Sequence, residues 1–143
     1  MREGGSAAVL LLAVAGLVLV LGLGIADAGI AFSARLQTAA AADAAALAAA
    51  PVTFRPFGAT GTPVAEARRL AGANGAVLTR CSCPVDRTWR PRVVEVVVER
   101  RVTLFGLGAI TVRASSRAEF APMLLLEGDG SESRRKVTSR DVG

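Results

Sequence analysis

Twenty consecutive residues near the start of the chain, Ala7 to Ala26, contain no charge, no amide and no proline. At about 1.5 Å per residue, a helix of this length covers roughly 30 Å, the thickness of the hydrocarbon core of a bilayer. The rest of a 143-residue chain is too small to bury such a helix on every side. We therefore expect one transmembrane helix that holds the remaining polypeptide on one side of the membrane.

A cleaved secretory signal is the alternative interpretation of this segment. Ala26-Asp27-Ala28 fits the small-x-small pattern of a signal-peptidase site, and cleavage there would leave a secreted protein starting at Gly29. The apolar stretch is, however, longer than the roughly 7–15 residues of a typical signal core. Residues with high helix propensity also continue past the supposed cut, because ten of the twelve residues in Ala39–Ala50 are alanine. The sequence thus favours a retained anchor.

The helix is expected to run from about Ser6 to Ala50, where the following proline, Pro51, disfavours its continuation. Residues at spacings of three and four form an apolar stripe on the emergent half: Ile25, Phe32, Leu36, Ala40 and Leu47. Asp43 falls on the same stripe. A narrow Ala-rich seam with one charge suits packing against other helices. Asp43 is therefore a candidate contact with a basic group or a free N-terminus of a neighbouring subunit, the alternative being an ordinary solvated side chain.

A small head is expected to follow this helix. The sequence divides into a leader over residues 1–6, a transmembrane and emergent helix over 7–50, a linker over 51–61, an extracytoplasmic head over 62–122 and a disordered tail over 123–143. Within the head, Thr62 and Pro63 are suited to the N-cap and first position of a helix. Asn74-Gly75 is a typical helix C-cap.

Three strands are predicted after the short helix, over residues 76–81, 92–103 and 109–115. In the second, Val94, Val96 and Val98 share one face. The last two strands should pair as an antiparallel hairpin packed on the short helix, because a turn with two glycines separates them. The predicted fold class is α+β, with a long N-terminal helix, a short helix and a small antiparallel sheet.

The residue inventory argues against an enzyme. The chain has no His, which excludes Ser-His and Cys-His nucleophilic pairs, His metal sites and the commonest general base. Gly22-Leu23-Gly24 lies inside the membrane span and is no dinucleotide fingerprint, and Gly58 to Pro63 lacks the Lys of a phosphate loop. We expect no catalytic residue, no cofactor and no metal.

Cys81 and Cys83 are the only cysteines. Two thiolates without His cannot complete a four-ligand zinc site. A mutual disulfide requires a turn, because residues i and i+2 on a strand lie about 6.6 Å apart, and Ser82 and Pro84 could accommodate one. The sequence leaves free thiols, this internal bridge and an intersubunit bridge open.

The formal net charge is +5, and only one of the 17 basic residues, Lys136, is lysine. A local surplus of arginine in the middle of the chain could attract lipid headgroups or anionic envelope polymers. An anchored module that binds such anions is therefore an alternative function, through Arg80, Arg87, Arg90 and Arg92. No nucleic-acid partner is expected.

Several segments together resemble the TadE/TadG-type pilus-assembly proteins of tight-adherence secretion systems, above all the short actinobacterial versions. The most specific segment is residues 37–50, Gln-Thr-Ala-Ala-Ala-Ala-Asp-Ala-Ala-Ala-Leu-Ala-Ala-Ala, and Arg2-Glu3-Gly4-Gly5-Ser6-Ala7 leads into the span. Ala73-Asn74-Gly75-Ala76 ahead of the cysteines, residues 93–98 and the segment 110–114 complete a resemblance over about residues 2–121.

The resemblance implies a pilin-like subunit of a Flp-type pilus or pseudopilus, whose partners are other pilin-like subunits and membrane lipids. It implies a cell-membrane location with the N-terminus cytoplasmic and the head outside. Prepilin processing would cut after Gly4 or Gly5. The glutamate that pilin-like proteins usually carry five residues after the cut is replaced by Val9 or Leu10, so membrane residence without processing is the alternative.

Overall fold

A computed structural model describes residues 4–54 and 61–124 of the chain. Two helices precede three strands: α1 (Gly4–Val52), α2 (Pro63–Ala73), β1 (Val77–Ser82), β2 (Arg92–Leu104) and β3 (Gly108–Phe120). The strands form one antiparallel sheet in the order β1-β2-β3. The predicted α+β class, with a long helix, a short helix and a small sheet, is confirmed.

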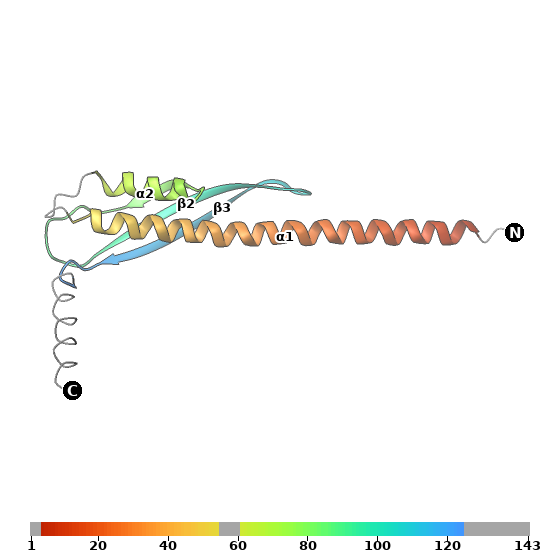
Figure 1. Ribbon diagram of the computed structural model, residues 1–143, viewed down its shortest axis with the longest axis horizontal. Coiled ribbons are helices and arrows are strands. Elements are labelled where there is room, and N and C mark those ends of the chain that lie inside the picture. Colours follow the sequence, from red (N-terminus) through yellow and green to blue (C-terminus); the bar gives the residue numbers. More distant parts are fainter. Residues whose placement is uncertain (1–3, 55–60, 125–143) are drawn as a thin grey trace, which may run out of the picture.

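The helix α1 dominates the shape of the molecule (Figure 1). Its 49 residues correspond to about 73 Å at 1.5 Å per residue. The N-terminal part extends away from the head, whereas the C-terminal part lies along the sheet. The leader and tail assigned to residues 1–6 and 123–143 fall largely outside the described residues.

The end of α1 differs from the expectation, because the helix continues through Pro51 to Val52 instead of ending at Ala50. A proline costs a helix its N–H donor, and in the last turn only one bond is lost. The chain then closes with tighter bonds from Thr53 N to Ala50 O (3.2 Å) and from Phe54 N to Pro51 O (3.1 Å). Phe54 is buried and forms an isolated bridge with Asp86, so this part of the predicted linker belongs to the head.

The β2–β3 hairpin is longer than predicted. Its register pairs Arg92 with Phe120 at one end and Leu104 with Gly108 at the other, which extends the last strand by five residues beyond Ser115. The turn is tight because Gly108 adopts a left-handed conformation (φ +74°) that a side chain would disfavour. The predicted alternation in β2 is confirmed, since Val94, Val96 and Val98 are fully buried.

An Ala-rich face of α1 forms the centre of the core. Fully buried alanines repeat along its C-terminal half: Ala41, Ala42, Ala45, Ala46 and Ala49. Small side chains let the helix axis approach the sheet closely, so α1 packs directly on β2 and β3. The prediction that the hairpin packs on the short helix is therefore wrong. The short helix α2 instead covers α1 and β1.

The start of α2 follows the predicted chemistry. Thr62 is extended and its hydroxyl accepts a hydrogen bond from Ala65 N (3.1 Å), while Pro63 occupies the first turn. The helix ends at Asn74, and Gly75 takes the left-handed conformation (φ +70°) expected after a helix C-cap. Ala67 and Ala71 are the fully buried alanines on the face that α2 turns toward the core.

Candidate functional site

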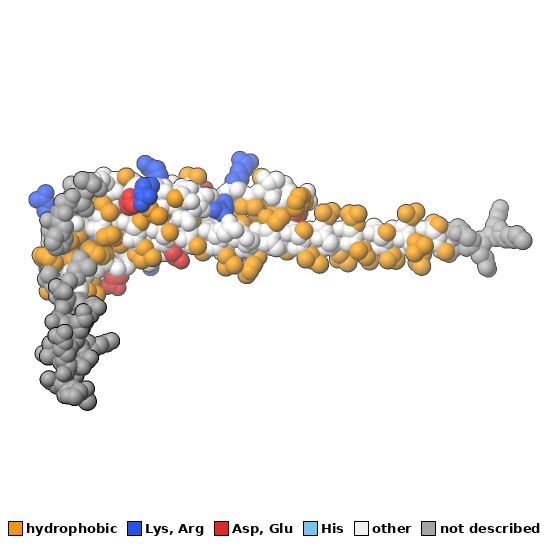
Figure 2. Space-filling view, viewed as in Figure 1, with side chains coloured by type: hydrophobic (Ala, Val, Ile, Leu, Met, Phe, Trp, Pro, Cys, Tyr) orange, Lys and Arg blue, Asp and Glu red, His pale blue; other side chains and the backbone are white. Residues whose placement is uncertain are grey.

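The N-terminal part of α1 is exposed on all sides. Within the described residues, the stretch beginning at Ala7 is the one helix long and apolar enough to cross a membrane. Figure 2 shows hydrophobic side chains along both edges of the free part of the helix. A helix that is apolar all round and has no covering protein requires an apolar solvent. Because the span matches the bilayer thickness, the surface from Ala7 to Ala26 is suited to lipid.

The predicted stripe lies on the emergent part of α1, on the face turned away from the head. Ile25, Phe32, Leu36 and Leu47 are 58–74% exposed, and Ala40 and Asp43 are exposed beside them. The positions that face the sheet, such as Ala34 and Thr38, are buried instead. The stripe is therefore a helix face that the chain's own head does not cover.

The structure leaves the carboxylate of Asp43 at the surface of this stripe. Among residues 4–54 and 61–124, no side chain forms an ion pair or hydrogen bond with it. The candidate contact with a neighbouring subunit remains a prediction.

A second acidic residue of α1, Asp27, lies on the opposite face and contacts the tip of the hairpin. Its side chain accepts hydrogen bonds from Phe105 N to Oδ1 (2.7 Å) and from Gly106 N to Oδ2 (2.8 Å). The residue is 6% exposed. A Cβ on Gly106 would lie 3.1 Å from Oδ2, so the missing side chain lets the carboxylate approach the turn.

In the sequence, Asp27 stands out only as the middle residue of the possible signal-peptidase site, and its contact with the hairpin was not predicted. The available signal was one acidic residue at the end of an apolar span, since charges at that depth are rare and are usually paired. Nothing in the sequence, however, identifies partners 78 and 79 positions away.

An apolar groove of about 440 Å³ separates the hairpin tip from the helix. Val20, Leu23 and Gly24 line it from α1, and Leu104, Gly106 and Leu107 line it from the hairpin. The hairpin thus reaches the level of the last two turns of the predicted span. Figure 1 shows the β2–β3 turn extending along α1 beyond the end of α2.

Arg100 joins three elements of the head. It donates from Nε to Gly75 O (2.9 Å), from one terminal nitrogen to Asn74 O, and from the other to Oε1 of Gln37. Gln37 in turn donates to the Ser33 hydroxyl (3.1 Å). Gln37, the first residue of the segment 37–50 that resembles the TadE/TadG proteins, therefore links α1 through Arg100 to β2 and the end of α2.

Arg92 is a structural residue of the opposite end of the head. It is buried, and its guanidinium donates to the carbonyls of Thr53 (3.1 Å), Asp86 (2.5 Å), Thr88 and Arg90 (3.3 Å). It also lies 5.5 Å from the centre of the Phe54 ring. Arg92 thus holds the loop between β1 and β2 against the end of α1. In the same loop, the Thr88 hydroxyl donates to the Asp86 carboxylate and lowers its pKa.

The four arginines proposed to bind anions are therefore not equivalent. Arg92 is inside the head, and Arg80 lies 3.9 Å from Glu95 on the outer face of the sheet. Arg87 and Arg90 are exposed in the loop. The structure thus leaves Arg80, Arg87 and Arg90 at the surface and removes Arg92 from the set that the sequence suggested.

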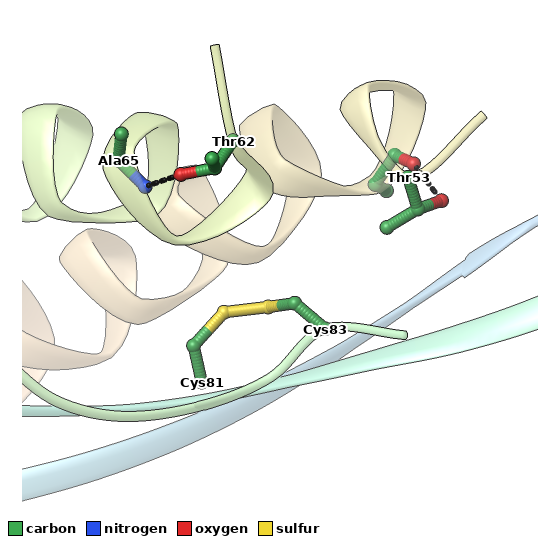
Figure 3. The surroundings of a disulfide bond; sticks show 6 residues. Thr53, Thr62, Ala65, Cys81 and Cys83 are labelled. Atoms are coloured by element: carbon green, nitrogen blue, oxygen red, sulfur yellow. Dashed lines mark hydrogen bonds between the residues drawn. A yellow bond between two sulfur atoms is a disulfide. The ribbon is translucent and has the colours of Figure 1, made fainter. Parts of the chain in front are cut away.

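The two cysteines are joined in the structure. Cys81 is in β1 and Cys83 follows the end of that strand, so their Cα atoms are 5.4 Å apart, closer than along a regular strand. Figure 3 shows the disulfide on the helix-facing side of the sheet. Both residues are half-buried against the core, so the bridge borders the packed interior.

The structure does not test the candidate cleavage site, and it shows no metal site among the described residues. Gly4 and Gly5 lie in the first turn of α1, and nothing in the fold bears on cleavage after them. Over the described ranges, no three residues among His, Cys, Asp and Glu are placed to hold a metal ion.

Comparison with known proteins gives one family. Residues 5–52 match the family model described as Flp pilus-assembly TadE/G-like. The match covers α1 almost completely, and it agrees with the resemblance found in the sequence. No curated protein and no solved structure matches the chain. The long helix is therefore a TadE/G-like segment, and its apolar span indicates a membrane-anchored protein.

Proposed function

We propose that this TadE/G-like chain is a non-enzymatic, single-pass, pilin-like subunit of a Flp/Tad-type pilus assembly or secretion system. Its N-terminus lies in the cytoplasm and its head lies outside the membrane. The observation that carries the proposal is the unbroken helix Gly4–Val52, whose stripe stays exposed along the emergent half. The pilus-assembly family matched over residues 5–52 supports the same role.

The stripe supports subunit packing because its composition differs from that of the opposite face. The head covers the alanine face of α1, whereas Phe32, Leu36 and Leu47 project outward. Phe32 to Leu47 spans about 22 Å along the helix. A contiguous exposed apolar surface of this kind marks an interaction site. Since the stripe continues from the membrane span, the partner that fits it is another helix emerging from the same bilayer.

Asp43 gives this helix contact a register. An unpaired carboxylate between two apolar helix surfaces is costly, so close packing favours the position that brings a basic group or a free α-amine to Asp43. Replacing Asp43 with Ala should reduce copurification with other pilus components, with Asp43→Asn as the variant that keeps the shape. Unchanged copurification of both variants would count against this role.

Photo-crosslinking in native membranes tests the stripe directly. A photoreactive residue at Leu36 should crosslink to other pilin-like subunits. The matched control is Val77 on β1, which is also an exposed apolar residue (69% exposed, against 58% for Leu36) but lies on the head. Crosslinks from Leu36 to lipid alone, or equal protein crosslinking from both positions, would contradict packing through the stripe.

A further inference from the structure

The turn of the β2–β3 hairpin has an unusual composition for a surface loop. Phe105 and Leu107 are each 77% exposed, although turns in water are usually built from small and polar residues. No charged residue occurs from Leu104 to Val112. Figure 2 shows hydrophobic side chains at this end of the hairpin, next to the free part of the helix. The tip therefore presents an apolar surface that residues 4–54 and 61–124 do not cover.

The position of the tip along α1 identifies what covers it. The groove beside Leu107 is lined by Val20 and Leu23, which belong to the predicted span. Val20 precedes the end of that span, Ala26, by about 9 Å of helix. If the span lies in lipid, the hairpin tip reaches below the membrane surface beside it.

Two backbone N–H groups at the tip have hydrogen-bond acceptors, as a position in lipid requires. In lipid an N–H group without an acceptor is costly, and the turn donors Phe105 N and Gly106 N both find one in Asp27. The same bonds satisfy a carboxylate that would otherwise be expensive at the membrane boundary.

Basic side chains lie farther from the span. Arg35 of α1 and Arg113 of β3 line one pocket together with Ile110 and Val112. From Ala26 to Arg35 is about 13 Å of helix, so this charge lies outside the hydrocarbon core when the span ends at Ala26. Arg113 is paired with Glu99 of β2.

From these observations we propose that the β2–β3 turn is a second membrane contact, in which Phe105 and Leu107 insert into the extracytoplasmic leaflet beside α1 while Asp27 caps the turn. The occupant of this surface is the lipid around the chain's own span. The proposal rests on the membrane position of Ala7–Ala26 and not on filament assembly, so it can be tested in pure lipid.

Fluorescence quenching by lipids brominated on the acyl chain tests the insertion. The full chain is reconstituted in phosphatidylcholine vesicles as Phe105→Trp and, as control, as Val77→Trp, which places the probe on an equally exposed site of the head. The unmodified chain, whose one tryptophan is Trp89, supplies the background. We expect the probe at position 105 to emit at shorter wavelength and to lose most of its emission in brominated lipid. The probe at 77 should lose almost none.

Three outcomes would overturn the proposal. Quenching of the probe at 105 by aqueous iodide with no effect of brominated lipid means that the tip is in water. A shielded probe that responds to neither quencher, with shielding that depends on protein concentration, means that a second copy covers it. Equal bromine quenching at 77 and 105 means that the whole head lies on the membrane. Adding Asp27→Ala should reduce bromine quenching at 105, since the uncapped turn no longer stays beside the span.

Discussion

Replacing Asp27 with Ala should release the hairpin tip from α1. The carboxylate accepts two bonds from backbone N–H groups, at 2.7 and 2.8 Å, and each hydrogen bond to a charged group contributes about 1.5–3 kcal/mol. Removing the charge also removes the cost of burying it, which offsets part of that sum. We therefore expect the tip to lose about 2–4 kcal/mol of docking free energy, with the rest of the sheet retained.

Amide hydrogen exchange of the full chain in detergent micelles measures this effect. Since about 1.4 kcal/mol corresponds to a factor of ten, exchange at Phe105 and Gly106 should accelerate roughly a hundredfold. Amides in the middle of the sheet, such as Val97, should keep their rates. Asp43→Ala is the matched control, because it removes the exposed second carboxylate of α1 without touching the hairpin. Unchanged exchange at Phe105 and Gly106, or an equal acceleration across the sheet, would refute the capping role.

Three further predictions concern the head. Ala45→Leu should destabilise the head by about 1–3 kcal/mol, because the larger side chain overpacks a fully buried position. Denaturant unfolding in micelles measures this loss, and Ala40→Leu on the exposed face of α1 should leave the stability unchanged. Arg92→Met should lower the free energy of unfolding by about 3 kcal/mol or more, because four backbone carbonyls lose their donor. The loop between β1 and β2 should then be cut by protease, and a loop as resistant as in the unmodified chain would contradict this role. Cys83→Ser should lower the free energy of unfolding by only about 1.5 kcal/mol, because the disulfide closes a very short loop. A variant that no longer folds would contradict this value.

The sequence was most informative where one local property decides the structure. The apolar run to Ala26 has the length of a membrane span, Thr62-Pro63 begins a helix by local hydrogen bonding, and the valines of β2 alternate because the pleat has a period of two. The exposed stripe was also predictable from helical spacing.

Other features depend on contacts between distant segments. The extension of β3 to Phe120 arises from pairing with Arg92–Val96, because residues 116–120 lack a strong strand signal of their own. The seam expected from the sequence is the stripe that stays exposed, and the alanine face that packs on the chain's own sheet, Ala41 to Ala49, was not predicted. The role of Arg92 could not be separated from that of the exposed arginines, since its acceptors are backbone carbonyls that leave no trace in composition.

Both proposals require that α1 stays intact through Asp27 and anchors the head in the membrane. Mass spectrometry of the mature N-terminus, on separate membrane and medium fractions of cells that produce the full chain, tests it most directly. We expect a membrane-bound protein that retains Ala7–Asp27 and begins at or before Ser6. A soluble protein beginning at Gly29 and recovered from the medium would contradict it.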